Sequence, residues 1–263
     1  MIVNGIKMVT LLELIIFLFF IILIFLYMVA IRKSNLTYKR WPHHRVICWI
    51  LGVLCVAISV IGPIAHMAHH HFVWHMIGHL LLGMLAPVLL VLSAPTTLLL
   101  RLLPVWQARR LTRVLRSKIT RIYTNPLVAT TLNIGGLWVL YTTDLYATML
   151  ENSILQILIH VHIFLAGYLF TVSLLYIDPV PYRVSYLYRT TVFVIALAAH
   201  EILSKYIYAN PPAGVEESQA KIGGMLMYYG GDAIDLIIIV VLFYQWYKST
   251  KPINGSTFSR LTS

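Results

Sequence analysis

Two histidines that could bind a metal, His75 and His79, lie four positions apart in an apolar segment, so they share one face if the segment is helical. Imidazole nitrogens are common metal ligands. Met76 lies beside the first histidine, and Met67 and Met84 flank the pair. A thioether combined with imidazole favours copper, and Cu(I) in particular, over magnesium or calcium. The motif therefore predicts a copper-binding helix face.

Three more ionisable residues interrupt other apolar segments: His160, His200 and Asp232. A charge exposed to lipid costs several kcal/mol, so these side chains are expected to face the protein interior. In the last segment, Met225 and Tyr229 share a helix face with Asp232, and that face could line the same site. His162 points away from His160 and is left out. The predicted metal site consists of His75, Met76, His79, His160, His200 and Asp232.

The elements that position these residues are predicted to be transmembrane helices. Hydrophobic residues make up 59% of the 263-residue chain and charged residues 11%, which is far more apolar than a soluble domain. Hydropathy predicts seven spans, at about 8–31, 46–65, 72–95, 126–143, 154–177, 187–208 and 222–247. We therefore expect an all-α polytopic membrane protein, with residues 1–263 forming a single seven-helix domain.

Local signals add three details to this prediction. Pro87 lies inside the third span, which continues past Pro95, so a kink followed by a short interfacial helix is expected. The first span lacks the features of a cleaved signal peptide and should be retained. The tail from Thr250 to Ser263 is expected to be short and mobile.

The basic residues predict the orientation in the membrane. The chain has 20 Lys and Arg against 9 Asp and Glu, and nucleic-acid binding is not expected, because membrane proteins collect basic residues in cytoplasmic loops. All but Lys7, Lys205 and Lys221 fall on one side of the predicted bundle or in the tail. That side is predicted to be cytoplasmic, with the N-terminus outside and the C-terminus in the cytoplasm.

This orientation brings the predicted ligands to similar depths. At 1.5 Å per residue, His75 and His79 lie roughly 5 to 10 Å below the outer surface, His160 roughly 10 Å and His200 roughly 12 Å. Asp232 follows at about 15 Å. The cluster from His69 to His71 lies at the outer mouth, where it either collects metal or is only a solvated loop. The coincidence of depth favours one shared site.

A longer pattern surrounds the first two histidines. His75-Met76-Ile77-Gly78-His79 is followed by Ala86-Pro87, Ser93-Ala94-Pro95 and Leu102-Leu103-Pro104. This stretch resembles the His-Met-x-x-His segment and the proline-marked continuation of the CtaG-type cytochrome c oxidase assembly factors. Gly62-Pro63, Asp144-Leu145-Tyr146, His160 and Gly223-Gly224 are weaker similarities. Gly78 departs from the family, which often has Gln there.

The resemblance implies a non-enzymatic role in the maturation of a haem-copper oxidase, at the copper-insertion stage. It implies a multi-pass protein of the bacterial cell membrane, in contact with lipid, whose partner is an oxidase subunit. Two alternatives from other classes remain at this point. One is an intramembrane zinc hydrolase with three histidine ligands and a carboxylate that handles the proton. The other is a haem-b electron-transfer protein with two axial histidines.

Overall fold

The computed structural model describes residues 2–251, which are helical and contain no strand. The predicted mobile tail therefore lies, from residue 252 onward, outside the described residues. Six helical segments are long and apolar enough to cross a membrane. They are α1 (Ile2–Thr37), α2 (His43–Val60), the run Phe72–Leu92, α12 (Ser153–Leu174), α13 (Tyr186–Ala209) and α14 (Glu217–Thr250).

The remaining predicted span, 126–143, is a shorter and irregular helical run. It consists of α9 (Pro126–Thr130), the π-helix η2 (Thr131–Gly135) and α10 (Gly136–Thr142). A π-turn widens the helix and frees backbone groups from their usual partners. His162 Nε2 donates a hydrogen bond to the carbonyl of Leu132 at 3.2 Å. The side chain of His162 thus supports this irregular run and points away from His160, as predicted.

The third predicted span is also irregular. It is divided into α4 (Phe72–His79), the π-helix η1 (Leu80–Leu85) and α5 (Ala86–Leu92). Pro87 stands at the start of α5, where its missing N–H is tolerated next to the π-turn. The chain then breaks at Ala94, whose φ is 55°, before the short helix α6 (Pro95–Leu102). The prediction of a short helix after Pro95 is confirmed, and a π-helix lies just before Pro87, where a kink was expected.

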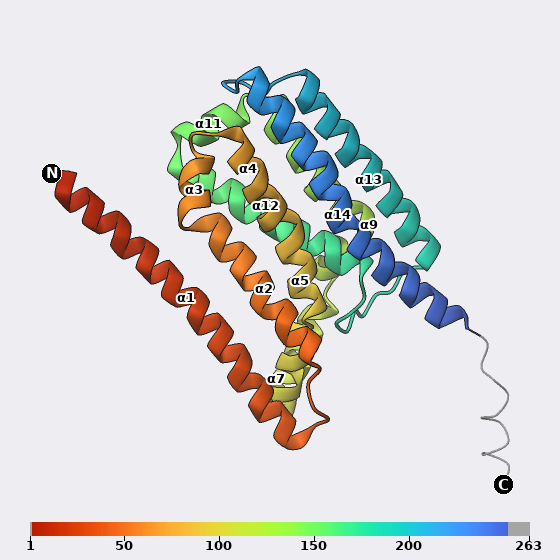
Figure 1. Ribbon diagram of the computed structural model, residues 1–263. Coiled ribbons are helices and arrows are strands. Elements are labelled where there is room, and N and C mark those ends of the chain that lie inside the picture. Colours follow the sequence, from red (N-terminus) through yellow and green to blue (C-terminus); the bar gives the residue numbers. More distant parts are fainter. Residues whose placement is uncertain (1, 252–263) are drawn as a thin grey trace, which may run out of the picture.

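The two ends of the bundle differ in composition. The end that we call the histidine end carries α3 (Pro63–Ala68), the start of α4, and α11 (Leu145–Glu151). The opposite end, the basic end, carries α6, α7 (Val105–Leu115) and α8 (Lys118–Tyr123). Figure 1 shows α3 and α11 together at one end and α7 at the other. The histidine-rich loop and the arginine-rich segment therefore lie on opposite sides of the bundle.

Close backbone contacts hold the central helices in place. A Cβ on Gly167 of α12 would lie 2.0 Å from the carbonyl oxygen of Gly83 in η1, so only glycine permits this approach. In contrast, α1 runs along the outside of the bundle (Figure 1). Its anchor is at the basic end, where Tyr27 is buried and donates a hydrogen bond to the Ser93 carbonyl at 2.8 Å.

A candidate metal site in a row of histidines

Four histidines from three helices form a row through the bundle. His75 and His79 come from α4, His160 from α12 and His200 from α13. The ring centroids of His75 and His160 are 6.4 Å apart, and those of His79 and His200 are 6.3 Å apart. We call His75 and His160 the outer pair, and His79 and His200 the inner pair. The predicted residues are thus brought together, but as two pairs.

The outer pair is hydrogen-bonded and borders open space. His75 Nε2 and the hydroxyl of Tyr141 are 3.0 Å apart. His160 Nδ1 donates to the carbonyl of Gln156 at 2.8 Å, which leaves the lone pair of the imidazole on Nε2. Both histidines border a cavity of about 430 Å³ that also reaches His69 at the histidine end. The outer pair can therefore be approached from that end.

The inner pair is buried and differs from the outer pair in its hydrogen bonding. His79 and His200 are each 4% exposed. Within the described residues, neither ring nitrogen of His79 has a hydrogen-bond partner, and Nε2 of His200 has none. An unpaired buried polar group costs about 1–3 kcal/mol, so such groups normally meet a water, an ion or a ligand. The geometry leaves imidazole lone pairs available for a metal.

A small cavity adjoins the inner pair. It has a volume of about 20 Å³, which is space for about one water or one ion. Its lining includes His79, His200, Met84 and Asp235. The lining therefore includes two imidazoles, a thioether and a carboxylate, among residues that are mostly apolar. Imidazole and thioether are donors that suit Cu(I), so the residues present fit this metal.

Helix α14 makes room for the inner pair through a glycine. A Cβ on Gly231 would lie 2.6 Å from His200 Cε1 and 3.7 Å from Met84 Cε, so the ring of His200 packs directly on the α14 backbone. Asp235 follows Gly231 by four residues and so lies on the same face, one turn further along. Its side chain is buried, with 5% exposed. The carboxylate that lines the small cavity therefore comes from Asp235.

Besides His75 and His160 of the outer pair, two further predicted ligands lie outside this small cavity. Met76 is fully buried in an apolar cluster with Phe72, which packs on Gly223 of α14. Asp232 is half-buried. Met225 and Tyr229 are 44% and 69% exposed, so their face is turned outward and the expectation that it lines the site is wrong. The face of α14 that is turned to the interior carries Gly231 and Asp235, not Met225 and Tyr229.

Three residues next to the histidine row were not predicted from the sequence as site residues. Met84 appeared only as one of several soft donors, although it lies next to the inner pair. Asp235 could have been found from its spacing to Gly231, because a glycine on an interior face marks a close approach. Tyr141 carried no signal, since an isolated tyrosine in an apolar run has no distinctive spacing.

The alternatives left open by the sequence gain no support from this geometry. Within residues 2–251, no three His, Cys, Asp or Glu side chains form a group that could hold a metal, so a three-ligand zinc site has no support and Asp235 does not form such a group with His79 and His200. The cavity of about 20 Å³ that His79 and His200 help to line is also far too small for a haem.

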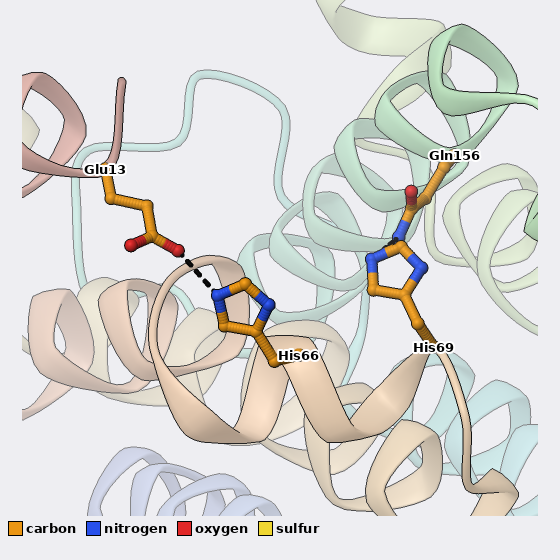
Figure 2. A network of polar contacts seen from close by, with 4 residues as sticks. All are labelled: Glu13, His66, His69 and Gln156. Carbon is orange, nitrogen blue, oxygen red and sulfur yellow. Dashed lines mark hydrogen bonds and ion pairs between the residues drawn. The ribbon is translucent and has the colours of Figure 1, made fainter. Parts of the chain in front are cut away.

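The histidines at the outer mouth are held by partners. Figure 2 shows His66 paired with Glu13 of α1, with Nε2 and Oε1 2.8 Å apart, and His69 facing Gln156 of α12. Burial, reinforced by neighbouring histidines, lowers the pKa of His69. A lowered pKa keeps this imidazole neutral at pH 7, which is the form that binds metals. Side-chain partners from α1 and α12 thus contact His66 and His69 at the histidine end.

Comparison with known proteins identifies relatives. The model of the cytochrome c oxidase caa3 assembly factor family (Caa3_CtaG) matches residues 25–249. An uncharacterized protein of Mycobacterium leprae is 28% identical over 242 residues, which are 84% of this chain and 36% of that protein. An uncharacterized protein of Mycobacterium bovis is 32% identical over 164 residues, which are 60% of this chain and 24% of that protein. No solved structure matches the chain.

The extent of these matches decides what they mean. This chain spans only 36% and 24% of the length of the two mycobacterial proteins, so they share a segment with it and extend well beyond it. The family model, in contrast, covers most of this chain, including every histidine of the row. The chain therefore belongs to the family of cytochrome c oxidase caa3 assembly factors.

Proposed function

We propose that this protein binds copper as cargo in the bacterial cell membrane and passes it to a subunit of a haem-copper oxidase. Membership of an oxidase assembly family supplies the general role. The observation that carries the finer proposal is the inner pair, in which both ring nitrogens of His79 and Nε2 of His200 find no hydrogen-bond partner among residues 2–251. Copper transfer would explain both the family role and two buried imidazoles from different helices that lie next to each other.

The residues around the inner pair suit Cu(I) for two reasons. His79, His200 and Met84 are neutral donors of the kind that Cu(I) prefers. A cation held by neutral ligands in a low-dielectric interior also needs a compensating charge, because an uncompensated buried charge is strongly unfavourable. Asp235 would supply that charge, since it lines the same cavity and lies one turn along α14 from Gly231, which contacts His200. The complete set would be electrically neutral, which favours retention within the membrane.

The outer pair would act as the entrance. His160 and His75 border the larger cavity, which reaches His69 at the histidine end. Copper would pass from this cavity to the outer pair and then to the inner pair. The second step would run from His75 to His79, which lie four residues apart on α4. The hydrogen bonds of His75 and His160 would make their hold on the metal weaker than that of the inner pair.

The proposal includes a topology of seven crossings within a single domain. The run Pro126–Thr142 would be the fourth crossing, in addition to the six long helices. An N-terminus outside the cell and a cytoplasmic C-terminus would place the histidine end outside and the basic end inside, as the distribution of Lys and Arg favours. Copper would then enter from the outer side.

Cysteine labelling tests this topology. Cys48 and Cys55 are the two native cysteines, both free, and are first replaced by serine. His70→Cys and Ile119→Cys then report on the histidine end and the basic end. We expect a membrane-impermeant reagent to label only position 70 in intact cells. Labelling of position 119 instead would mean that the orientation is reversed.

Elemental analysis tests the function. Protein purified in mild detergent is expected to contain copper, without stoichiometric zinc or iron. A deletion strain without a related gene should lose oxidase copper and oxidase activity while oxidase transcript levels stay constant. Complementation with the wild type should restore both, whereas complementation with His79→Ala should not. Full oxidase activity in the deletion strain would refute the assembly role, and metal-free protein that still supports the oxidase would refute the copper role alone.

A further inference from the structure

A large groove lies at the basic end, far from the histidine row. Its volume is about 900 Å³. One wall is a single face of α7, formed by residues at helical spacing, and the opposite wall comes from the end of α1 and from α6. The lining residues are Tyr38, Leu100, Leu103, Val105, Ala108, Arg109, Thr112, Arg113, Arg116, Ser117 and Lys118.

The charged wall of this groove lacks anionic partners. Arg109, Arg113 and Arg116 recur along α7 at spacings of four and three residues, and Lys118 follows them. None of the lining residues is acidic. In the part of the chain that the structure describes, the two ion pairs involve Glu13 and Glu217, which both lie toward the histidine end. Clustered positive charges repel one another, so this wall is suited to an anion.

The other wall of the groove is apolar. Leu100 and Leu103, at the end of α6, provide hydrocarbon surface within the same groove. A free anion would use the cationic wall and leave this surface exposed to water. A molecule with an anionic head and an aliphatic chain would use both walls.

The position of α7 agrees with such an amphiphile. This helix has no buried residue, and Trp106 and Val114 are 55% and 62% exposed. A helix that carries basic residues with exposed apolar ones is typical of the membrane interface, where tryptophan is also enriched. The groove therefore lies where lipid headgroups are found.

We propose that this groove binds an anionic phospholipid. The phosphate group would lie against Arg109, Arg113 and Arg116, with Lys118 at the edge. The start of one acyl chain would lie against Leu100 and Leu103. This site is independent of copper and of the proposed oxidase role.

Lipid binding can be measured by native mass spectrometry of the full chain in mild detergent. Phosphatidylglycerol and phosphatidylcholine serve as the anionic and zwitterionic probes. Arg113→Gln should weaken phosphatidylglycerol binding by about fivefold, and Arg109→Gln with Arg113→Gln by about 25-fold, since a basic residue near anionic lipid contributes about 1 kcal/mol. These residues are exposed, so the variants should keep their helical content, which circular dichroism checks.

Arg110→Gln is the matched control. Arg110 lies on the same helix but outside the groove, 4.9 Å from the ring centre of Trp106, and its loss removes the same charge. We expect less than about a twofold effect. An equal effect of Arg110→Gln and Arg113→Gln would replace the site with diffuse surface attraction. Equal binding of phosphatidylcholine, or displacement of phosphatidylglycerol by inorganic phosphate, would also overturn the lipid assignment.

Discussion

The outer and inner histidine pairs have the same composition but opposite environments. In the outer pair, His75 contacts the Tyr141 hydroxyl and His160 binds a backbone carbonyl, beside a cavity of about 430 Å³. In the inner pair, the ring nitrogens of His79 are unpaired and the adjoining cavity has about 20 Å³. The comparison indicates that hydrogen bonding, more than residue type, separates a histidine that stabilises the bundle from one that is free for a ligand.

Removal of an inner histidine should have the largest effect. His79→Ala and His200→Ala should each lower Cu(I) affinity by more than about 100-fold, because even loss of a second-shell partner costs 10–100-fold in metal affinity. Competition with a chromophoric Cu(I) chelator under anaerobic conditions measures this. His162→Ala is the matched control, because that ring is bonded to the Leu132 carbonyl. The Cu(I) affinity of this variant should stay unchanged. Normal copper binding by a stably folded His79→Ala variant would remove the inner pair from the site.

Loss of the compensating charge should have the next largest effect. Asp235→Asn keeps the size of the side chain but leaves a bound cation without a buried anion, so Cu(I) affinity should fall by about tenfold or more. Asp232→Asn, three residues away and half-buried, should change it by less than about twofold. The same competition assay serves both variants. If the Asp232 variant proves to be the weaker binder, the sequence-based choice of Asp232 is the better one.

The thioether should matter less than the imidazoles or the charge. Met84→Leu conserves volume, so the free energy of unfolding should change by less than about 1.5 kcal/mol. Cu(I) affinity should nevertheless fall by several-fold, because a soft donor is lost. Met76→Leu, in the apolar cluster, should leave the affinity unchanged. X-ray absorption spectroscopy of the copper-loaded protein should show a sulfur neighbour in the wild type, and its persistence in the Met84 variant would contradict this role.

The outer pair should show the reverse pattern, with an effect on stability and little on copper. Tyr141→Phe removes the hydroxyl that contacts His75, so it should lower the free energy of unfolding by about 1–3 kcal/mol. Copper affinity at the inner pair should change by less than about twofold. Thermal unfolding in detergent, followed by circular dichroism, measures the first effect. A large loss of copper affinity without a loss of stability would show that the two pairs act as one site.

Much of the architecture followed from local sequence alone. Long apolar runs can satisfy their backbone only as helices in lipid, so the six long helical segments were predictable. Pro87 and Pro95 marked an irregularity and a break because proline lacks the N–H that a regular helix needs. The spacing of His75 and His79 predicted that both lie on one face, and each lies near a histidine of another helix, His160 or His200. These features depend on periodicity and composition, which are properties of the sequence.

The tertiary structure decided which residues lie next to the inner pair and which histidines are hydrogen-bonded. Two π-turns shift the helix faces, so counting residues at a regular 3.6 per turn could not place Met84 relative to His79. The close contact of Gly231 with His200 brought Asp235 to the cavity and left Asp232 half-buried. Tyr141, 66 residues away, engages His75, whereas His160 donates to the carbonyl of Gln156 one turn earlier on α12. The sequence by itself determined which metal-binding side chains lie on the apolar helices. Helix packing decided the surroundings of His75, His79 and His200, because these depend on neighbours distant in the chain.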